Sequence, residues 1–214
     1  MPLPKLDSLI FDMDGTLWNA TQSYADVWNE GMRRYGLTGH LRAADITGFI
    51  GMTIGQIFDT GLLGKASDLP VSRDQFLLTL DEIEDEIMPT RGGILYPGVK
   101  EGLEALSSRY KLFLVSNCSP DGLVNFMRFT GTTALFTDSV SHGQRPVPKS
   151  DNIRLMVTRH QLCSAAYVGD TQHDADQAHQ AGLPFIFASY GFGTCRDAEL
   201  TIANFAELVR HLMS

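Results

Sequence analysis

The chain is organised around the stretch Leu9-Ile10-Phe11-Asp12-Met13-Asp14-Gly15-Thr16-Leu17. Its apolar start predicts a buried strand, which breaks at Asp12 into a carboxylate, a spacer, a second carboxylate and a glycine. Side chains two positions apart on an extended chain point the same way, so Asp12 and Asp14 can face one small volume beyond the strand. Two such close carboxylates repel each other unless a cation or a proton lies between them. The plainer interpretation is a strand followed by an Asp-Gly turn, and the rest of the chain must decide between the two.

Composition places the chain among ordinary soluble globular proteins, with 43% hydrophobic and 20% charged residues in a length of 214. The formal net charge of −8 argues against a nucleic-acid backbone or an anionic membrane as a partner. No apolar run approaches the roughly 18 residues that a membrane helix needs, and the first strand begins too early to leave room for a cleaved signal. The three cysteines form neither a disulfide framework nor a metal motif. A cytoplasmic protein is therefore expected.

Strands and helices are predicted to alternate along most of the chain, which is typical of a doubly wound, Rossmann-like parallel α/β sheet. The predicted strands cover residues 6–11, 111–115, 135–137, 165–168 and 185–188. The predicted helices cover residues 22–35, 53–58, 72–88, 99–109, 120–129, 150–160, 172–181 and 205–213.

One interval departs from this alternation. Roughly a hundred residues separate the first two strands, far more than one crossover needs, and their pattern is helical. We therefore expect a core domain formed by residues 1–18 and 97–214, and a small inserted helical cap formed by residues 19–96, hinges included. The acidic run in the helix at 72–88 is expected to be a solvated surface of the cap; it comprises Asp81, Glu82, Glu84, Asp85 and Glu86.

Polar side chains follow several of the predicted strands. Ser116 and Asn117 follow the second strand, Asp170 and Asp174 follow the strand at 165–168, and Lys149 precedes a helix. Parallel strands deliver these loops to one edge of the sheet, where open α/β sheets bind ligands. Carboxylate oxygens without a His or Cys cluster suit Mg²⁺ better than Zn²⁺. Such a site matches phosphoryl transfer, in which positioning and charge neutralisation supply most of the catalysis.

The motifs Asp12-Met13-Asp14-Gly15-Thr16, Ser116-Asn117, Lys149 and Gly169-Asp170-Thr171-Gln172-His173-Asp174 occur in the order of the four motifs of the haloacid dehalogenase-like (HAD) hydrolases. The chain most closely resembles the phosphoglycolate phosphatase-like and β-phosphoglucomutase-like members, which have a helical cap after the first strand. The resemblance covers nearly the whole chain.

The resemblance implies a role for each matching residue. Asp12 is expected to be the nucleophile and Asp14 the general acid/base, while Ser116, with the Asn117 amide, holds the transferring phosphoryl group. The resemblance also implies that Lys149 balances the charge of the nucleophile and the phosphate. For the Mg²⁺ site it implies Asp12, the backbone carbonyl of Asp14, Asp170 and Asp174, the last orienting the ligands or Lys149. Dehalogenases of this family lack an acid/base carboxylate at position 14, which favours phosphate esters.

Two positions depart from the family pattern. Asn19 stands where many relatives have Asp, and Arg145-Pro146-Val147-Pro148-Lys149 stands where Lys-Pro-x-Pro-Asp is usual. Aligning the prolines would put Arg145 in the place of the lysine. We prefer Lys149, because some relatives place the lysine directly before a helix start similar to Ser150-Asp151-Asn152-Ile153.

The predicted function is a Mg²⁺-dependent phosphatase that hydrolyses a small organophosphate monoester through an aspartyl-phosphate. Met52 and Thr53 are the cap residues expected to face the substrate. The alternatives are a phosphomutase similar to β-phosphoglucomutase, and a non-catalytic binding or regulatory member of the fold. The partner is expected to be a small phosphorylated metabolite, with no nucleic acid or membrane, and the protein a monomer or homodimer.

Overall fold

The computed structural model describes residues 4–64 and 69–214. Residues 1–3 and 65–68, which fall in the predicted core and cap segments, lie outside the described residues. Six parallel strands form one sheet in the order β5-β4-β1-β6-β7-β8. Their bounds are β1 Ser8–Phe11, β4 Lys111–Ser116, β5 Asp138–Ser141, β6 Ala165–Gly169, β7 Phe185–Ala188 and β8 Leu200–Ile202. The predicted α/β fold with a parallel sheet is confirmed.

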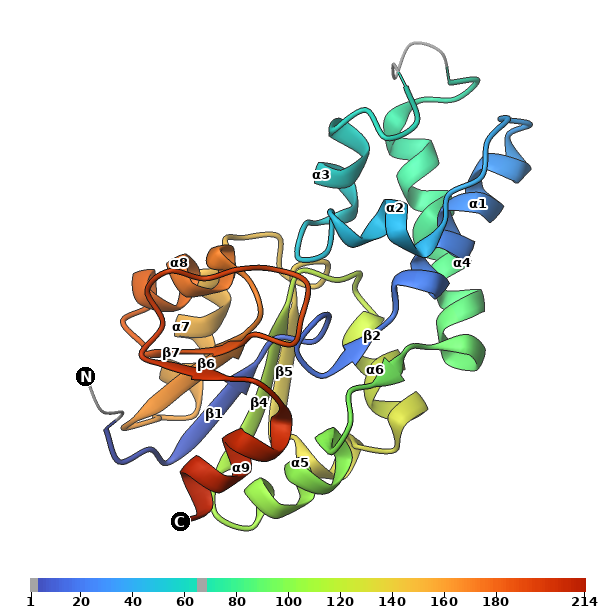
Figure 1. The fold of residues 1–214 in the computed structure, drawn as a ribbon. Helices are drawn as coiled ribbons and strands as arrows, with labels where there is room; N and C mark the ends of the chain where they lie inside the picture. The colour runs from blue at the N-terminus through green and yellow to red at the C-terminus, as the bar shows by residue number, and fades with distance from the viewer. Residues whose placement is uncertain (1–3, 65–68) are drawn as a thin grey trace.

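Helices cover both faces of the sheet (Figure 1), because successive side chains of a buried strand point to opposite faces. On β1, Leu9 and Phe11 pack on one face and Ile10 on the other. The first face is covered by α5 (Val99–Ser107), α6 (Gly122–Thr130) and α9 (Phe205–Met213). The second is covered by α7 (Lys149–Arg159) and α8 (Gln172–Gln180).

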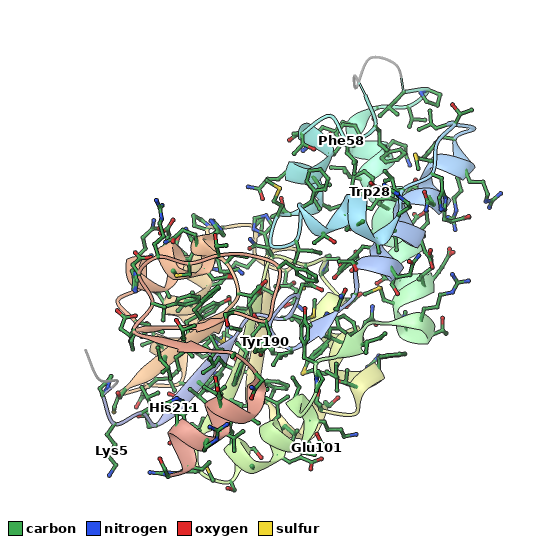
Figure 2. The ribbon with its side chains drawn as sticks, viewed as in Figure 1. Lys5, Trp28, Phe58, Glu101, Tyr190 and His211 are labelled. Carbon is green, nitrogen blue, oxygen red and sulfur yellow. The ribbon has the colours of Figure 1, made fainter. Side chains whose placement is uncertain are left out.

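Four helices lie together beyond the carboxyl ends of β1 and β4, at the upper right of Figure 1. They are α1 (Thr21–Arg34), α2 (Ala43–Thr47), α3 (Ile54–Asp59) and α4 (Arg73–Arg91). Their apolar stripes pack around Phe76 and Leu80 of α4. Trp28 and Phe58, labelled in Figure 2, belong to the same cluster. We refer to these four helices and the loops between them as the cap.

Two short connecting segments join the cap to the sheet. β2 (Trp18–Asn19) pairs antiparallel with β3 (Ile94–Leu95), so the chain enters and leaves the cap through neighbouring strands. Both segments lie near the predicted boundaries between core and cap, which follow residues 18 and 96. Within residues 4–64 and 69–214, no helix combines the length and apolar character needed to cross a membrane.

The prediction of a strand at 135–137 is wrong. Thr133–Leu135 forms a short 3-10 helix, and the strand is β5, which begins at Asp138. The edge strand β8 and the short helix α2 were not predicted. β5 and β8 lie at the two edges of the sheet, so neither carries the continuous apolar run that indicates a buried central strand.

Candidate active site

The acidic site lies where three parallel strands end. Asp12 directly follows β1 and Asp170 directly follows β6, while Ser116 is the last residue of β4. The backbone N–H of Asp12 donates to the carbonyl of Val168 at 2.9 Å, so Asp12 is still held by the pairing of the neighbouring strand. β4, β1 and β6 are neighbours in the sheet, so their ends lie close together, as expected.

Lys149 lies between two of the carboxylates. Its ammonium donates to Asp174 at 2.7 Å and to Asp12 at 3.1 Å, and all three side chains are only 1% exposed. Burial by itself would lower the pKa of Lys149, but the charges of Asp12 and Asp174 outweigh it and raise that pKa well above its ordinary value. Lys149 is therefore a fixed positive charge inside the site.

Asp174 is positioned by the start of α8. Its carboxylate accepts from the backbone N–H (3.1 Å) and hydroxyl (2.7 Å) of Thr171, which in turn caps the backbone N–H of Asp174. This reciprocal capping box fixes the first turn of the helix. Burial raises the pKa of Asp174, but the charge and hydrogen bond of Lys149 outweigh that effect, so the pKa is lowered and the group stays ionised.

The carboxylates of Asp12, Asp170 and Asp174 form a buried cluster whose oxygen atoms come within 4.8 Å of one another. Burial raises the pKa of Asp12 to about 6, with Lys149 opposing the rise and Asp174 adding to it. Burial and the charges of Asp174 and Asp12 raise the pKa of Asp170 well above its ordinary value. One ammonium does not neutralise three carboxylates, and all donors are hard oxygens, so the residues fit a divalent cation such as Mg²⁺.

Asp170 is enclosed by backbone. Its carboxylate accepts from the N–H of Phe192 at 2.7 Å, and a Cβ on Gly15 would lie only 2.2 Å from it. Gly15 also has a φ of +80°, which a residue with a side chain rarely adopts. The hydroxyl of Tyr190, labelled in Figure 2, donates to the carbonyl of Thr16 at 2.7 Å. This hydrogen bond holds the loop after β7 against the turn after β1.

Asp14 has partners different from those of Asp12. Its carboxylate accepts from the indole N–H of Trp18 (2.9 Å) and from the hydroxyl of Tyr24 (3.0 Å). Burial and the nearby charge of Asp12 raise the pKa of Asp14 to about 7, although both hydrogen bonds oppose the rise. A carboxyl group with such a pKa can both donate and accept a proton near neutral pH.

The loop after β4 connects the sheet to the cap. Ser116 lies close enough to Asp12 for its hydroxyl to lower the pKa of that carboxyl group. The side-chain amide of Asn117 donates to the carbonyl of Gly51 at 2.8 Å, and the hydroxyl of Ser119 donates to Glu84 at 2.7 Å. The cap thus rests on the site through two hydrogen bonds from this loop.

A cavity lies between the cap and the loop after β4, with Asp14 and Ser116 in its wall. Of the two predicted cap residues, Met52 lines this cavity and is 43% exposed. Thr53 lies outside the lining: its hydroxyl accepts from the N–H of Gln56 and caps α3.

The two unusual positions of the sequence have local partners. The guanidinium of Arg145 donates to Asn152 at 2.9 Å, whereas the ammonium that contacts Asp12 is that of Lys149. Asn19 accepts from the N–H (3.1 Å) and hydroxyl (2.7 Å) of Thr21 where α1 begins.

The acidic run of α4 is not entirely on the surface, and for Glu84 the prediction of a solvated side chain is wrong. Glu84 is 4% exposed, lines the cavity and accepts from Ser119. Its spacing from Phe76 and Leu80, four residues per step, puts all three on one helix face, and this spacing was the signal that could have identified it. The hydroxyl of Tyr24 donates to Asp14, and this contact was not predicted from the sequence, which indicated only a helix over residues 22–35.

Comparisons with known proteins agree with this geometry. The sequence profile of haloacid dehalogenase-like hydrolases matches residues 9–188. The chain is 24% identical to a probable phosphatase, IndB, of Dickeya dadantii, over 94% of this chain and 91% of that protein. It is 27% identical to a phosphoglycolate phosphatase of Nitrosospira multiformis, over 92% and 88% of the two chains.

Solved structures show the same fold. A crystal structure described as a predicted phosphoglycolate phosphatase from Haemophilus somnus superposes with a TM-score of 0.83 at 22% identity, over 97% of this chain and 98% of that one. CbbY from Rhodobacter sphaeroides, in complex with phosphate, superposes with a TM-score of 0.81 at 20% identity, over 98% and 100%. The predicted family is confirmed: the chain belongs to the haloacid dehalogenase-like hydrolases, and is an enzyme similar to their phosphoglycolate phosphatases.

Proposed function

We propose that this protein is a Mg²⁺-dependent phosphatase that hydrolyses a small organophosphate monoester through an aspartyl-phosphate on Asp12. The observation that carries the proposal is the position of Lys149, which holds Asp12 and Asp174 beside Asp170 while Asp14 faces the cavity. This arrangement offers a nucleophile, a proton donor and a site for positive charge around one small volume. The names of the phosphatase relatives support the same chemistry.

The reaction begins with attack of an Asp12 carboxylate oxygen on phosphorus. The bond between phosphorus and the ester oxygen breaks, and Asp14 donates its proton to that oxygen, so that a neutral alcohol leaves. Ser116 and Lys149 hold the transferring group and balance its charge. Mg²⁺ bound by Asp12, Asp170 and the Asp14 carbonyl, with Asp174 as neighbour, would neutralise charge on the phosphoryl oxygens.

Hydrolysis of the aspartyl-phosphate completes the cycle. Water attacks phosphorus, Asp14 takes its proton, and the bond between phosphorus and the Asp12 oxygen breaks to release inorganic phosphate. The hydrogen bonds from Trp18 and Tyr24 hold Asp14 in place through both proton transfers. A residue with a pKa near the working pH suits this double use.

We propose that residues 19–96 act as the cap over a core formed by residues 1–18 and 97–214. The antiparallel pairing of β2 with β3 puts both connections side by side, which suits a hinge. Closure over the site would exclude water while the phosphoryl group is transferred. The proposed partner is a small phosphorylated metabolite and the proposed location the cytoplasm, with the protein a monomer or homodimer.

Hydrolysis of p-nitrophenyl phosphate tests the proposal. We expect activity with Mg²⁺, its loss in EDTA, and a loss of about a thousandfold or more in Asp12→Asn. Asp176→Asn, an exposed aspartate on α8, is the matched control and should retain activity. Acid-quenched protein should carry a phosphate on the peptide that contains Asp12. Equal activity of Asp12→Asn and the parent would reject the nucleophile, and transfer to a sugar hydroxyl instead of water would favour the phosphomutase.

A further inference from the structure

The cavity beside Asp14 is apolar on its cap side. Its cap lining includes Val27, Trp28, Ile46, Phe49, Ile50 and Ile57, contributed by three helices and the loop between α2 and α3. Asp14, the proposed proton donor to the departing oxygen, lies in the wall of the same cavity. A phosphate ester whose phosphorus faced Asp12 would therefore have this space available for its alcohol part.

The described lining of the cavity contains no positively charged side chain. Asp14 and Glu84 are its carboxylates, and among residues 4–64 and 69–214 no Lys, Arg or His lines the cavity. The arginines of the cap have acidic partners elsewhere: Arg33 and Arg34 pair with Glu30, Arg42 with Asp45, Arg73 with Asp59 and Arg91 with Asp26. An anionic group on the alcohol part would thus meet apolar side chains, neutral polar ones and two carboxyl groups, and no cation of the described lining would pair with it.

The phosphoryl end of the site differs in this respect. The ammonium of Lys149 is 2.7 Å from Asp174 and 3.1 Å from Asp12, so it pairs with carboxylates of the acidic cluster. Lys149 does not line the cavity. One negatively charged group, the phosphate, is accommodated at the strand ends. A second negatively charged group would find no positively charged side chain in the described lining of the cavity.

Resting on the proposed phosphatase activity, we propose that the substrate is a phosphate monoester of an uncharged, predominantly apolar alcohol, whose apolar part occupies the cap cavity. Esters that carry a carboxylate or a second phosphate at that end are rejected. This substrate class differs from the one that the names of the phosphoglycolate phosphatase relatives state for those proteins, because phosphoglycolate carries a carboxylate on its alcohol part.

A matched pair of esters tests the proposal. Benzyl phosphate and 4-carboxybenzyl phosphate differ by one carboxylate at the end remote from phosphorus, and glycerol 3-phosphate supplies an uncharged but polar alcohol. With Mg²⁺ and the full chain, kcat/KM for benzyl phosphate is expected to exceed that for either other ester by about tenfold or more, because an unpaired carboxylate or unpartnered hydroxyls must enter an apolar space.

The outcomes separate the two proposals. If p-nitrophenyl phosphate and all three esters stay intact, the phosphatase proposal fails, and the substrate class fails with it. If p-nitrophenyl phosphate is hydrolysed but the carboxylated ester or the glycerol ester matches or exceeds benzyl phosphate, only the substrate class is overturned. Phosphoglycolate as the best of a wider panel would overturn it in the same way.

A cation placed in the lining provides a second test. Ile50 is a half-buried lining residue on the cap loop, and Ile50→Arg should reduce the preference for benzyl over 4-carboxybenzyl phosphate about tenfold. Leu78→Arg is the matched control, because Leu78 is 57% exposed on α4 and lies outside the lining. The control should keep the parent's preference. An unchanged ratio in a folded Ile50→Arg would contradict the location of the alcohol part.

Discussion

Asp12 and Asp14 are two positions apart, yet their surroundings give them different chemistry. Asp12 contacts an ammonium, whereas Asp14 is held by two neutral donors, Trp18 and Tyr24. Burial together with the charge of Asp12 raises the pKa of Asp14 to about 7, so that a large share of it is protonated near neutral pH. In the proposed mechanism, the same backbone turn thus presents an ionised carboxylate and a proton donor to one substrate.

Replacing Asp14 by Asn tests this difference. An alkyl alkoxide needs a proton to leave, whereas p-nitrophenolate leaves without one. Asp14→Asn should therefore lower kcat/KM for benzyl phosphate by about a hundredfold or more, and that for p-nitrophenyl phosphate by much less. Steady-state kinetics on the two esters in one preparation make each ester the control for the other. Equal losses would contradict the role of Asp14 as an acid.

Substitutions at Lys149 and Arg145 test which of the two supplies the positive charge of the site. Lys149→Met leaves Asp12 and Asp174 buried without their cation, which should destabilise the protein by about 3–5 kcal/mol and abolish most of the activity. Arg145→Met removes one hydrogen bond to Asn152, worth about 1 kcal/mol, and should keep the activity. Urea unfolding and phosphate release measure both effects. If Arg145→Met is inactive and Lys149→Met is active, Arg145 and not Lys149 supplies the positive charge of the site.

The sequence predicted which strand ends carry acidic side chains, because Asp12 and Asp170 each follow an uninterrupted apolar run. It did not predict the partners of these groups. The contact of Tyr24 with Asp14 joins helix α1 to the turn after β1 and depends on how the cap is seated. Glu84 was assigned to the surface because its neighbours in the sequence are acidic, although its helical position faces inward.

The turn after β1 depends on a glycine. A Cβ at Gly15 would lie 2.2 Å from the carboxylate of Asp170, and its φ of +80° is unfavourable for alanine by about 1–2 kcal/mol. Gly15→Ala should therefore displace Asp170, lower the stability and raise the Mg²⁺ concentration needed for half-maximal activity. Magnesium titration of phosphate release measures the effect.

Gly48 provides the matched control for Gly15→Ala. It has a φ of −70°, and a Cβ there would meet nothing within 4 Å. Gly48→Ala should leave the magnesium titration unchanged and stabilise the protein by about 0.4–1 kcal/mol. If both variants titrate like the parent, the close approach of Gly15 to Asp170 has no influence on the metal site.

Central strands were predicted more accurately than edge strands, for a physical reason. β1 and β6 are covered on both faces, so their sequences are mostly apolar and their residues are all buried. β5 lies at an edge and reads Asp138-Ser139-Val140-Ser141, which lacks such a run. The stretch just before it, 135–137, begins with the apolar residues Leu135 and Phe136 and was therefore mistaken for the strand.

The cap and the sheet are joined by more than their two covalent connections. The amide of Asn117 reaches the carbonyl of Gly51, and the hydroxyl of Ser119 reaches the carboxyl of Glu84. Of these groups only Glu84 can change its charge, and it is nearly inaccessible to water. The stability of this arrangement should therefore depend on pH through this residue.

Burial is the main cause that raises the pKa of Glu84, to about 8 from an ordinary value of 4.5, and the charges of Asp81 and Asp14 add to the rise. Between these two values the unfolded chain has lost the proton that the folded protein keeps. The free energy of unfolding must then fall as pH rises from about 4.5 to about 8, by about 1.4 kcal/mol for each unit of the pKa difference.

Glu84→Gln keeps the hydrogen bond with Ser119 but cannot ionise. Urea unfolding followed by the fluorescence of Trp18 and Trp28 should give the parent a clear loss of stability from pH 5 to pH 8, and the variant a smaller one. At pH 8 the variant should be the more stable by a few kcal/mol. Glu82→Gln, an exposed position on the same helix, should follow the parent. If the parent and Glu84→Gln lose stability in parallel, ionisation of Glu84 has no part in the pH dependence, and another buried carboxyl such as Asp14 must account for it.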